Sequence, residues 1–419
     1  MLTTRPRGTN DILPGMVEHW RYLEDLIHSI CRQYGYREIR TPIFEHTELF
    51  ARGVGETTDI VEKEMYSFQD RGERSITLRP EGTAPTVRAF LENKYYAAAQ
   101  PTKFYYIGPM FRYGRPQAGR FRQFHQFGVE VFGSMDPSID AEVIALAMDY
   151  YERLGLQNLQ LHINSVGCAK CRPVHRDKLR EHLSASLADL CPTCQGRYEK
   201  NPLRIFDCKS PRCQELVAGA PTITDCLCPE CAGHLEKVET YLQTVGIKYK
   251  IDPYLVRGLD YYTKTAFEIM VEGIGAQSSI GGGGRYDRLV EECGGPAIPG
   301  IGFAMGLERI LLTMEQQGLL AALPASQEVF IATVAPEQDL AAFKLVQELR
   351  RQGVGAEKDY LARSLKAQLK FADKLGCNYV VILGEEELAK GKAMLKSMRT
   401  GQQTEVNLAE IGAYVKQKV

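Results

Sequence analysis

The chain has 419 residues, of which 44% are hydrophobic and 25% are charged, so it is long enough to form two or three domains with buried cores. The arginines within the first fifteen residues are not followed by an apolar stretch, and no run of about eighteen apolar residues occurs. We therefore expect neither a secretory leader nor a membrane-spanning helix. We therefore expect a cytoplasmic protein that does not enter the membrane. The formal net charge is −1, so any nucleic-acid partner must be bound by a local basic patch.

The first predicted helix covers residues 16–34 and ends at Gly35. Its apolar face carries, at helical spacing, Trp20, Leu23, Ile27, Ile30 and Tyr34. Residues 36–50 then predict a strand that Pro42 interrupts. Because proline is poorly tolerated in a central strand, this strand is expected at an edge or an interface.

Five further β-type runs follow along the chain. They cover residues 75–80, 103–111, 121–133, 265–271 and 278–284. Regular crossover helices do not separate these runs, so we predict a mainly antiparallel sheet and an α+β fold for this part of the chain.

Two changes in sequence texture predict the domain organisation. Residues 165–250 are cysteine-rich, polar and helix-prone, which indicates an insertion within a first domain of residues 1–325. From residue 326 to 419, strands expected at 328–334, 354–360 and 378–384 alternate with helices expected near 337–351 and 363–375. This alternation predicts a small, separate α/β domain.

Two segments carry residues suited to a polyphosphate. Residues 111–133 predict a hairpin that presents four guanidinium groups, on Arg112, Arg115, Arg120 and Arg122. Guanidinium groups match phosphate oxygens bidentately, although a solvated charged hairpin has the same pattern. Residues 300–312 combine a strand of small residues with a helix that begins with Glu308 and Arg309. Neither a dinucleotide fingerprint nor a phosphate-binding P-loop is present, so a nucleotide would bind by another architecture.

These segments together resemble a known family. Arg112 in its FRxx hairpin and Arg309 in GLER resemble motifs 2 and 3 of class II aminoacyl-tRNA synthetases. Residues 255–269, 281–290 and 77–84 resemble signature segments of histidyl-tRNA synthetases, and the likeness covers nearly the whole chain. The resemblance implies a class II antiparallel catalytic sheet, an insertion domain and a C-terminal anticodon-binding domain. It also implies a homodimer whose interface includes the first helix and the Pro42 strand.

The resemblance implies that the protein activates L-histidine with ATP and transfers it to tRNA(His). By the same likeness, Glu81 and Thr83 bind the substrate ammonium group, Glu130 and Tyr262 bind the imidazole nitrogens, Tyr261 lies close by, and Gln126 lies near the carboxylate. For ATP, the family pattern places Arg112 on the α-phosphate and Arg309 on the γ-phosphate, with Arg257 between the α-phosphate and the histidine carboxylate. Arg120 and Gly302 complete the expected ATP site, and Mg²⁺ neutralises the β and γ oxygens.

Spacing alone leaves alternatives open for several residues. Arg257 could pair with Asp260 or another carboxylate, and Glu130 could be a surface charge of the sheet. The four glycines at 281–284 could form a flexible loop or allow close approach of the backbone to a ligand. His125 has no recognised partner and is predicted to be a structural polar residue.

One position departs from the family pattern. Motif 2 usually continues as FRxE, whose glutamate contacts the adenine amino group, but this chain has Gly114 there. Adenine recognition is therefore expected to use backbone groups or a neighbouring residue such as Arg115 or Arg120.

The cysteines of the insertion suggest a metal. Cys168 and Cys171, followed after nineteen residues by Cys191 and Cys194, have spacing that suits a structural zinc site. Cys208, Cys213, Cys226, Cys228 and Cys231 lie in the same insertion, so a different foursome or a second site is conceivable. Zinc is not a general requirement of the resembled family, and free cysteines also pack as small hydrophobic residues.

Two rival interpretations remain from other functional classes. The first is a histidine-sensing regulatory relative of the same family, which typically lacks the anticodon-binding domain and loses the RGLDYY segment; this chain keeps both. The second is a zinc-dependent nucleic-acid-binding protein, which leaves the arginine and glycine motifs unexplained.

Overall fold

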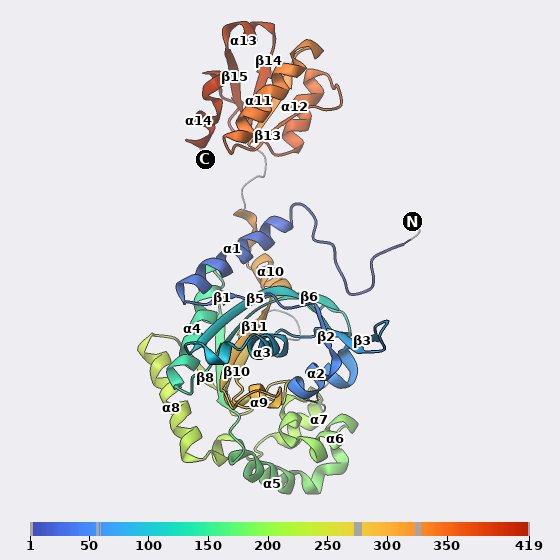
Figure 1. Cartoon of the computed structure of the whole chain (residues 1–419), viewed down its shortest axis with the longest axis vertical. Coiled ribbons are helices and arrows are strands. Elements are labelled where there is room, and N and C mark those ends of the chain that lie inside the picture. Colours follow the sequence, from blue (N-terminus) through green and yellow to red (C-terminus); the bar gives the residue numbers. More distant parts are fainter. Residues whose placement is uncertain (1–2, 56–57, 59, 272–278, 323–327, 418–419) are drawn as a thin grey trace. The chain divides into compact units, whose positions relative to one another are not determined.

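The computed structural model describes residues 3–55, 58, 60–271, 279–322 and 328–417 (Figure 1). The chain divides into two compact units, residues 1–321 and 322–419. Each unit has its own hydrophobic core and is described separately. Within the described residues, no helix combines the length and the apolar character needed to cross a bilayer.

The first unit is built on a sheet with the strand order β1-β5-β6-β11-β10-β9-β7-β8 in the described residues. The strand bounds are β1 Arg37–Glu38, β5 Thr102–Phe111, β6 Gln123–Phe132, β7 Leu159–Ser165, β8 Lys250–Ile251, β9 Thr263–Val271, β10 Ser279–Arg285 and β11 Gly300–Gly306. Neighbouring strands are antiparallel except for the β1–β5 and β7–β8 pairs. The prediction of a mainly antiparallel sheet is confirmed.

The two faces of this sheet bury different helices. One face packs against α1 (Val17–Gln33), α4 (Pro137–Arg153), α8 (Pro229–Thr244) and α10 (Leu307–Gln316) in the main core. The other face carries α3 (Thr83–Glu92) and α9 (Leu289–Glu292) over a smaller apolar cluster. Side chains alternate along a strand, and Phe127, Val129 and Val131 of β6 belong to the main core. The residues that alternate with them along the strand, among them Gln126 and Glu130, therefore point to the α3 side.

The segment around Pro42 differs from its prediction. Instead of one interrupted strand, residues 36–50 form β1, then β2 (Phe44–His46), then the start of α2 (Thr47–Val54). β2 leaves the main sheet and pairs with β4 (Ser75–Leu78), which also pairs with β3 (Tyr66–Gln69). The single strand is replaced by two because Pro42 separates segments that join different sheets, but in the described residues each of the two strands lies at the edge of its sheet, as predicted.

The cysteine-rich insertion is helical, as predicted. It contains α5 (Cys171–Leu183), α6 (Pro192–Lys200) and α7 (Pro211–Val217), and it leads into α8. Its own apolar cluster is small and includes three cysteines, Cys194, Cys208 and Cys213. The segment therefore has little hydrophobic core of its own to stabilise it.

The second unit is the predicted α/β domain. Its sheet has the order β13-β12-β14-β15-β16 in the described residues, and β12 pairs in parallel with β13 and β14. The bounds are β12 Val329–Thr333, α11 Asp339–Arg351, β13 Ala356–Lys358, α12 Leu365–Lys374, β14 Tyr379–Leu383, α13 Glu385–Lys390, β15 Lys392–Ser397, β16 Gln403–Asn407 and α14 Ile411–Lys416. The helices α11 and α12 belong to separate apolar clusters that use alternate residues of β12.

Candidate active site

Four of the arginines singled out from the sequence line one cavity of about 380 Å³ in the first unit. Arg112 and Arg120 come from the connection between β5 and β6, Arg257 precedes β9, and Arg309 lies in the first turn of α10. Burial lowers the pKa of Arg112 and that of Arg309, and the Arg120 charge also lowers the pKa of Arg309. A cavity that concentrates this much positive charge is suited to a polyanion.

Neighbouring groups fix the positions of these arginines. Arg112 Nε donates to Pro80 O at 2.7 Å, and its guanidinium lies 5.2 Å from the centre of the Phe124 ring. Arg309 donates to Gly119 O at 3.3 Å and to Ser279 O at 2.5 Å, so it joins the β5–β6 connection to β10. These contacts preorganise the guanidinium groups before any ligand binds.

The other two hairpin arginines do not line this cavity. Arg115 is exposed. Arg122 lies with its guanidinium 3.8 Å from the centre of the Tyr113 ring, where it forms a cation–π contact. The hairpin therefore presents only half of its guanidinium groups to the cavity.

Arg257 occupies the cavity wall beside a carboxylate. Its Nη1 lies 3.2 Å from Glu268 Oε1 on β9, so of the alternatives left open, Asp260 or another carboxylate, the structure shows the pair with another carboxylate. Its Nε is buried and lacks a hydrogen-bond partner within the described part of the chain. A buried donor of this kind is costly to leave unpaired, which makes a bound anion an effective partner.

A second, fully buried group of polar residues lies on the α3 side of the sheet, around Glu130. Its side chain is 1% exposed, which rules out a surface charge. Oε1 accepts from Thr83 Oγ1 at 2.7 Å and from the Tyr106 hydroxyl at 3.2 Å, and Oε2 accepts from the Tyr286 hydroxyl. The pKa of Glu130 is raised to about 8, because burial and, to a smaller extent, the nearby Glu81 outweigh the opposing effect of the hydrogen bonds.

Glu81 lies two residues before the start of α3, next to this group. Its carboxylate accepts backbone N–H bonds of 2.8 Å from Thr83 and from Ala84, and burial raises its pKa above the usual value. An ionised carboxylate has about four acceptor sites, so Glu81 keeps acceptor capacity for an ammonium group. Thr83 thus contacts both carboxylates.

Tyr261 and Tyr262 form the aromatic wall of this region. Their ring centres are 4.7 Å apart, and the Arg257 guanidinium lies 5.9 Å from the Tyr262 ring centre. The structure thus places Arg257 between the cationic cavity and the buried carboxylate group. Gln126 also links the two, because it lines the cavity and its buried Oε1 has no hydrogen-bond partner among the described residues.

Two glycines make room for these side chains. A Cβ on Gly282 would lie 2.9 Å from Arg257 Nη1 and 2.6 Å from Phe267 O. A Cβ on Gly302 would overlap the Glu130 carboxylate and Val129 O. Gly302 therefore lies beside Glu130 and is not among the residues that line the arginine cavity; its expected part in the ATP site stays a prediction. The glycines of β10 are ordered strand residues and not a flexible loop.

His125, predicted to be a structural polar residue, has a partner that the sequence did not reveal. Its Nδ1 lies 3.0 Å from Glu308 Oε1, and its backbone N–H donates to the same carboxylate at 2.9 Å. The contact could not be inferred from local pattern because 183 residues separate the two positions. It ties β6 to α10, the two elements that carry Gln126 and Arg309.

At motif 2, a Cβ on Gly114 would lie 3.2 Å from Arg120 Nε and 3.4 Å from Glu64 Oε1. Arg120 Nη2 donates to the same Glu64 oxygen at 2.7 Å. A carboxylate from a distant part of the sequence therefore lies next to the position where the family's glutamate would begin.

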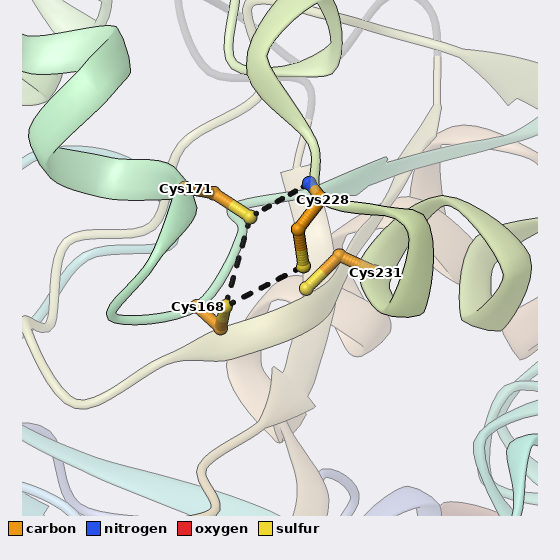
Figure 2. A group of neighbouring side chains, drawn as sticks. All are labelled: Cys168, Cys171, Cys228 and Cys231. Carbon is orange, nitrogen blue, oxygen red and sulfur yellow. Dashed lines mark hydrogen bonds between the residues drawn. The ribbon is translucent and has the colours of Figure 1, made fainter.

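The proposed cysteine foursome is corrected by the structure. Cys168 and Cys171 meet Cys228 and Cys231, whereas Cys191 and Cys194 meet Cys208 and Cys213; within each group all four sulfur atoms lie within 4.8 Å of one another. Figure 2 shows the first group, with sulfur atoms from the start of α5 and the start of α8 turned toward one another. Two four-cysteine groups that could hold metal ions thus replace the single predicted one.

Sequence reasoning missed four residues of this site: Glu64, Tyr106, Glu268 and Tyr286. Tyr286 lies in the GGGGRYD segment and Glu268 follows the RGLDYY segment at strand spacing, so both were within recognised motifs. Tyr106 could have been found from alternation, because it shares a sheet face with Gln126 and Glu130 through the β5–β6 pairing.

Comparison with known proteins decides the family. A family model described as histidyl-tRNA synthetase matches residues 8–190 and 218–310, and one described as an anticodon binding domain matches residues 328–418. The histidine–tRNA ligase of Desulforamulus reducens is 68% identical over 99% of each chain, and that of Moorella thermoacetica is 63% identical over 99% of this chain and 98% of the relative. This chain belongs to the histidyl-tRNA synthetase family.

The structural comparison agrees. The crystal structure of apo S. aureus histidyl-tRNA synthetase superposes with a TM-score of 0.85 at 43% identity, and the match covers 99% of this chain and all of that chain. The class II synthetase family and the α+β fold predicted from the motifs are confirmed. The match of the histidyl-tRNA synthetase model leaves out residues 191–217, the segment that contains the whole second cysteine group.

Proposed function

We propose that the protein is a histidine–tRNA ligase that forms histidyl-adenylate from L-histidine and ATP and then transfers the histidyl group to tRNA(His). The observation that carries this proposal is the position of Arg257 between two different sites. On one side lies a cavity lined by cationic groups that suits a triphosphate. On the other lies a buried group of carboxylates and tyrosines that suits an amino acid with a polar ring.

The amino-acid site explains selectivity for histidine. Glu81 offers an acceptor to the ammonium group, and Glu130 with Tyr262 offers polar partners to the imidazole nitrogens. A competing amino acid without a ring N–H would leave Glu130 buried and without that partner, which is costly. Hydrogen bonds from Thr83, Tyr106 and Tyr286 hold the Glu130 carboxylate in place for this task.

Activation is an in-line attack of the histidine carboxylate on the α-phosphorus, with pyrophosphate as the leaving group. Arg112 and Arg257 stabilise the negative charge that develops on the α-phosphate, and Arg309 binds the γ-phosphate. Mg²⁺ would neutralise the β and γ oxygens. The cavity also contains the carboxylates of Glu268 and Glu308, which are oxygen ligands of the type that Mg²⁺ prefers.

In the second step, the 3′-terminal ribose hydroxyl of the tRNA attacks the histidyl carbonyl and AMP leaves. The adenylate phosphate can accept the hydroxyl proton, so a side-chain base is not required. The match of residues 328–418 to an anticodon binding domain supports a tRNA substrate. We place the reaction in the cytoplasm, where a tRNA substrate and reduced cysteines both occur.

The proposed active form is a homodimer. The small sheet exposes two phenylalanines on one face: Phe44 is 57% exposed and Phe68 is 49% exposed. They pair with Leu78 and Ile76, two residues apart on β4, so they share that face. Such an apolar face indicates an interaction surface, and it lies next to Pro42, which the family likeness places at the interface. Phe44→Asp should convert a dimer into a monomer in analytical ultracentrifugation.

The test of the function is amino-acid-dependent exchange of pyrophosphate into ATP, measured with all twenty amino acids. We expect exchange with histidine alone and a loss of about 100-fold or more in Arg257→Ala, which removes preorganised charge at the reacting phosphate. Arg115→Ala is the matched control, because that arginine lies outside the cavity, and it should keep nearly full activity. Histidine binding without exchange by any amino acid would contradict the proposal and support the regulatory alternative.

A further inference from the structure

We infer that the insertion binds two structural Zn²⁺ ions, one in each four-cysteine group, and that the first ion supports the wall of the histidine site. The first site consists of Cys168, Cys171, Cys228 and Cys231, and the second of Cys191, Cys194, Cys208 and Cys213. The zinc assignment does not depend on the proposed function. The support that the first ion gives to the histidine site does rest on the proposed function.

The sulfur positions fit tetrahedral zinc. With Zn–S distances of about 2.3 Å, the sulfur atoms of a tetrahedral site lie about 3.8 Å apart. In the first group, Cys168 Sγ lies 3.6 Å from Cys171 Sγ and 3.9 Å from Cys228 Sγ, as Figure 2 shows. In the second group, Cys191 Sγ lies 3.8 Å from Cys208 Sγ. A disulfide requires about 2.05 Å, so neither group is arranged as a pair of disulfides.

Backbone amides are directed at these sulfur atoms. The N–H of Cys228 donates to Cys171 Sγ at 3.1 Å, and that of Lys170 donates to Cys168 Sγ at 3.4 Å. In the second group, the N–H of Cys191 donates to Cys213 Sγ at 3.3 Å. Hydrogen bonds to ligand atoms hold the ligands in position and stabilise thiolate charge. Four thiolates fill the tetrahedral shell, so both sites are structural and not catalytic.

The second ion stabilises a segment that has little other means of support. Residues 191–217 lie outside the family-model match, and within them the structure has only short helices around a small cluster that contains three of the four cysteines. Small modules of this kind are usually stabilised by disulfides or a metal. A zinc ion would join the start of α6 to the residues around the start of α7.

The first ion supports the histidine site through Arg172, the residue after Cys171. Arg172 donates Nη2 to the backbone carbonyl of Tyr262 and Nε to Val166 O at 3.1 Å. The backbone carbonyl of Gly167, the residue before Cys168, accepts from the Lys264 N–H at 3.0 Å. The turn that carries two zinc ligands is therefore hydrogen-bonded to the Tyr262 carbonyl and to the backbone of Lys264, two residues later.

The second site reaches the same segment less directly. Asn201, the residue after α6, donates to Asp260 at 3.0 Å. This contact involves one side chain two residues before Tyr262, whereas the first site contacts Tyr262 itself. Loss of the first ion should therefore disturb histidine binding more than loss of the second.

The first experiment measures the metal content of the purified full-length chain by mass spectrometry. We expect two zinc ions per chain, one in Cys228→Ser, one in Cys208→Ser, and two in Cys226→Ser. Cys226 is the matched control, because it lies in the same insertion and belongs to neither group. Cobalt substitution of the wild-type chain should give the absorption of tetrahedral thiolate sites. A wild-type chain with no metal, with iron, or with disulfides would overturn the zinc assignment whether or not the variants fold.

The second experiment measures histidine affinity by calorimetry in the same variants. Cys228→Ser should weaken histidine binding by about tenfold, whereas Cys208→Ser should change it by less than about threefold and Cys226→Ser should not change it. Equal affinity in Cys228→Ser and the wild-type chain, with one zinc lost, would overturn the support of the histidine site. Metal content does not depend on the reaction catalysed, so these outcomes are separate from failure of the proposed function.

Discussion

The Thr83 hydroxyl donates a hydrogen bond of 2.7 Å to the buried carboxylate of Glu130, and the backbone N–H of Thr83 donates to Glu81 at 2.8 Å. One residue at the start of α3 thus positions two carboxylates inside the first unit. Two acids placed this close in a buried site disfavour each other's ionisation. Burial is the larger cause of the raised Glu130 pKa of about 8, and the neighbouring Glu81 adds to it. Before an amino acid binds, the ionised form of Glu130 is therefore disfavoured in this pocket.

We predict that Glu130→Gln changes how stability depends on pH. The pKa of Glu130 is about 8 in the folded chain and near the ordinary value of 4.5 when unfolded. Its favourable contribution is thus fully present below pH 4.5 and is lost as the pH rises through 8. Because glutamine has no charge to bury at high pH, the variant should lose less stability as the pH rises. Its melting temperature at pH 9 should exceed that of the wild type by about 2–4 °C for each kcal/mol by which its free energy of unfolding is higher.

The same variant should bind histidine at least about tenfold more weakly, because the amide NH2 replaces one of the two oxygens that accept hydrogen bonds from Thr83, Tyr106 and Tyr286. Thermal melts at pH 6 and pH 9 and calorimetry with histidine measure the two effects. Glu236→Gln, at an exposed position of α8, should leave both unchanged. A Glu130→Gln melting curve with the wild-type dependence on pH would show that Glu130 is not held at a raised pKa.

A second prediction concerns Arg285, which follows the glycines of β10. Arg285 and Asp140 are both 0% exposed and form an ion pair, and His234 of α8 lies 3.1 Å from the same carboxylate. Burial raises the pKa of Asp140, but His234 and Arg285 outweigh it and the pKa lies below its usual value. Arg285→Ala should lower the free energy of unfolding by about 3–5 kcal/mol, because it leaves a buried charge without its partner.

Urea denaturation near neutral pH checks this prediction. Arg288→Ala, three residues later and largely exposed beside Glu292, should cost less than about 1 kcal/mol. The stability that Asp140 contributes should also fall as the pH falls through its lowered pKa. Similar losses in the two arginine variants would contradict the structural role given to Arg285.

The sequence could predict what depends on local pattern. The β-type runs that form β6 and β9, the apolar face of α1, and the strand–helix alternation of the second unit all follow from local pattern, and the structure confirms them. The motifs also predicted that Arg112, Arg257 and Arg309 act together, and the structure brings them to one cavity. Their exact roles stay predictions.

The sequence could not predict what depends on long-range topology. The partners of Cys168 and Cys171 come from the start of α8, sixty residues away in the case of Cys168 and Cys228, because α5 and α8 begin side by side. Spacing favoured the nearer pair, Cys191 and Cys194, and was wrong. The His125–Glu308 contact was missed for the same reason, because the partners of a residue in the folded chain cannot be inferred from its sequence neighbours.

A third prediction concerns adenine. Glu64 accepts from Arg120 at 2.7 Å and lies next to Gly114, so we propose that Glu64 and Arg120 replace the glutamate usually found in motif 2. Glu64→Gln should raise the KM for ATP about tenfold, as expected for loss of a charged hydrogen bond of about 1.5 kcal/mol, and leave the KM for histidine unchanged. Pyrophosphate exchange at varied ATP and at varied histidine separates the two. Glu62→Gln, two residues earlier on the surface, serves as the control, and an unchanged KM for ATP in Glu64→Gln would assign adenine recognition to other groups.

The last prediction compares one substitution, glycine to alanine, at two positions with opposite surroundings. At Gly302, a Cβ would overlap the Glu130 carboxylate and Val129 O in a central strand. Gly302→Ala should therefore force the strands apart, destabilise the chain by about 1–3 kcal/mol and abolish histidine binding. At Gly233 in α8, a Cβ would meet nothing within 4 Å, and alanine should stabilise that helix by about 0.5–1 kcal/mol with full activity. Melting curves and pyrophosphate exchange of both variants provide the measurement. Because the chemical change is identical, effects of the same sign would mean that Glu130 does not lie against the β11 backbone at Gly302.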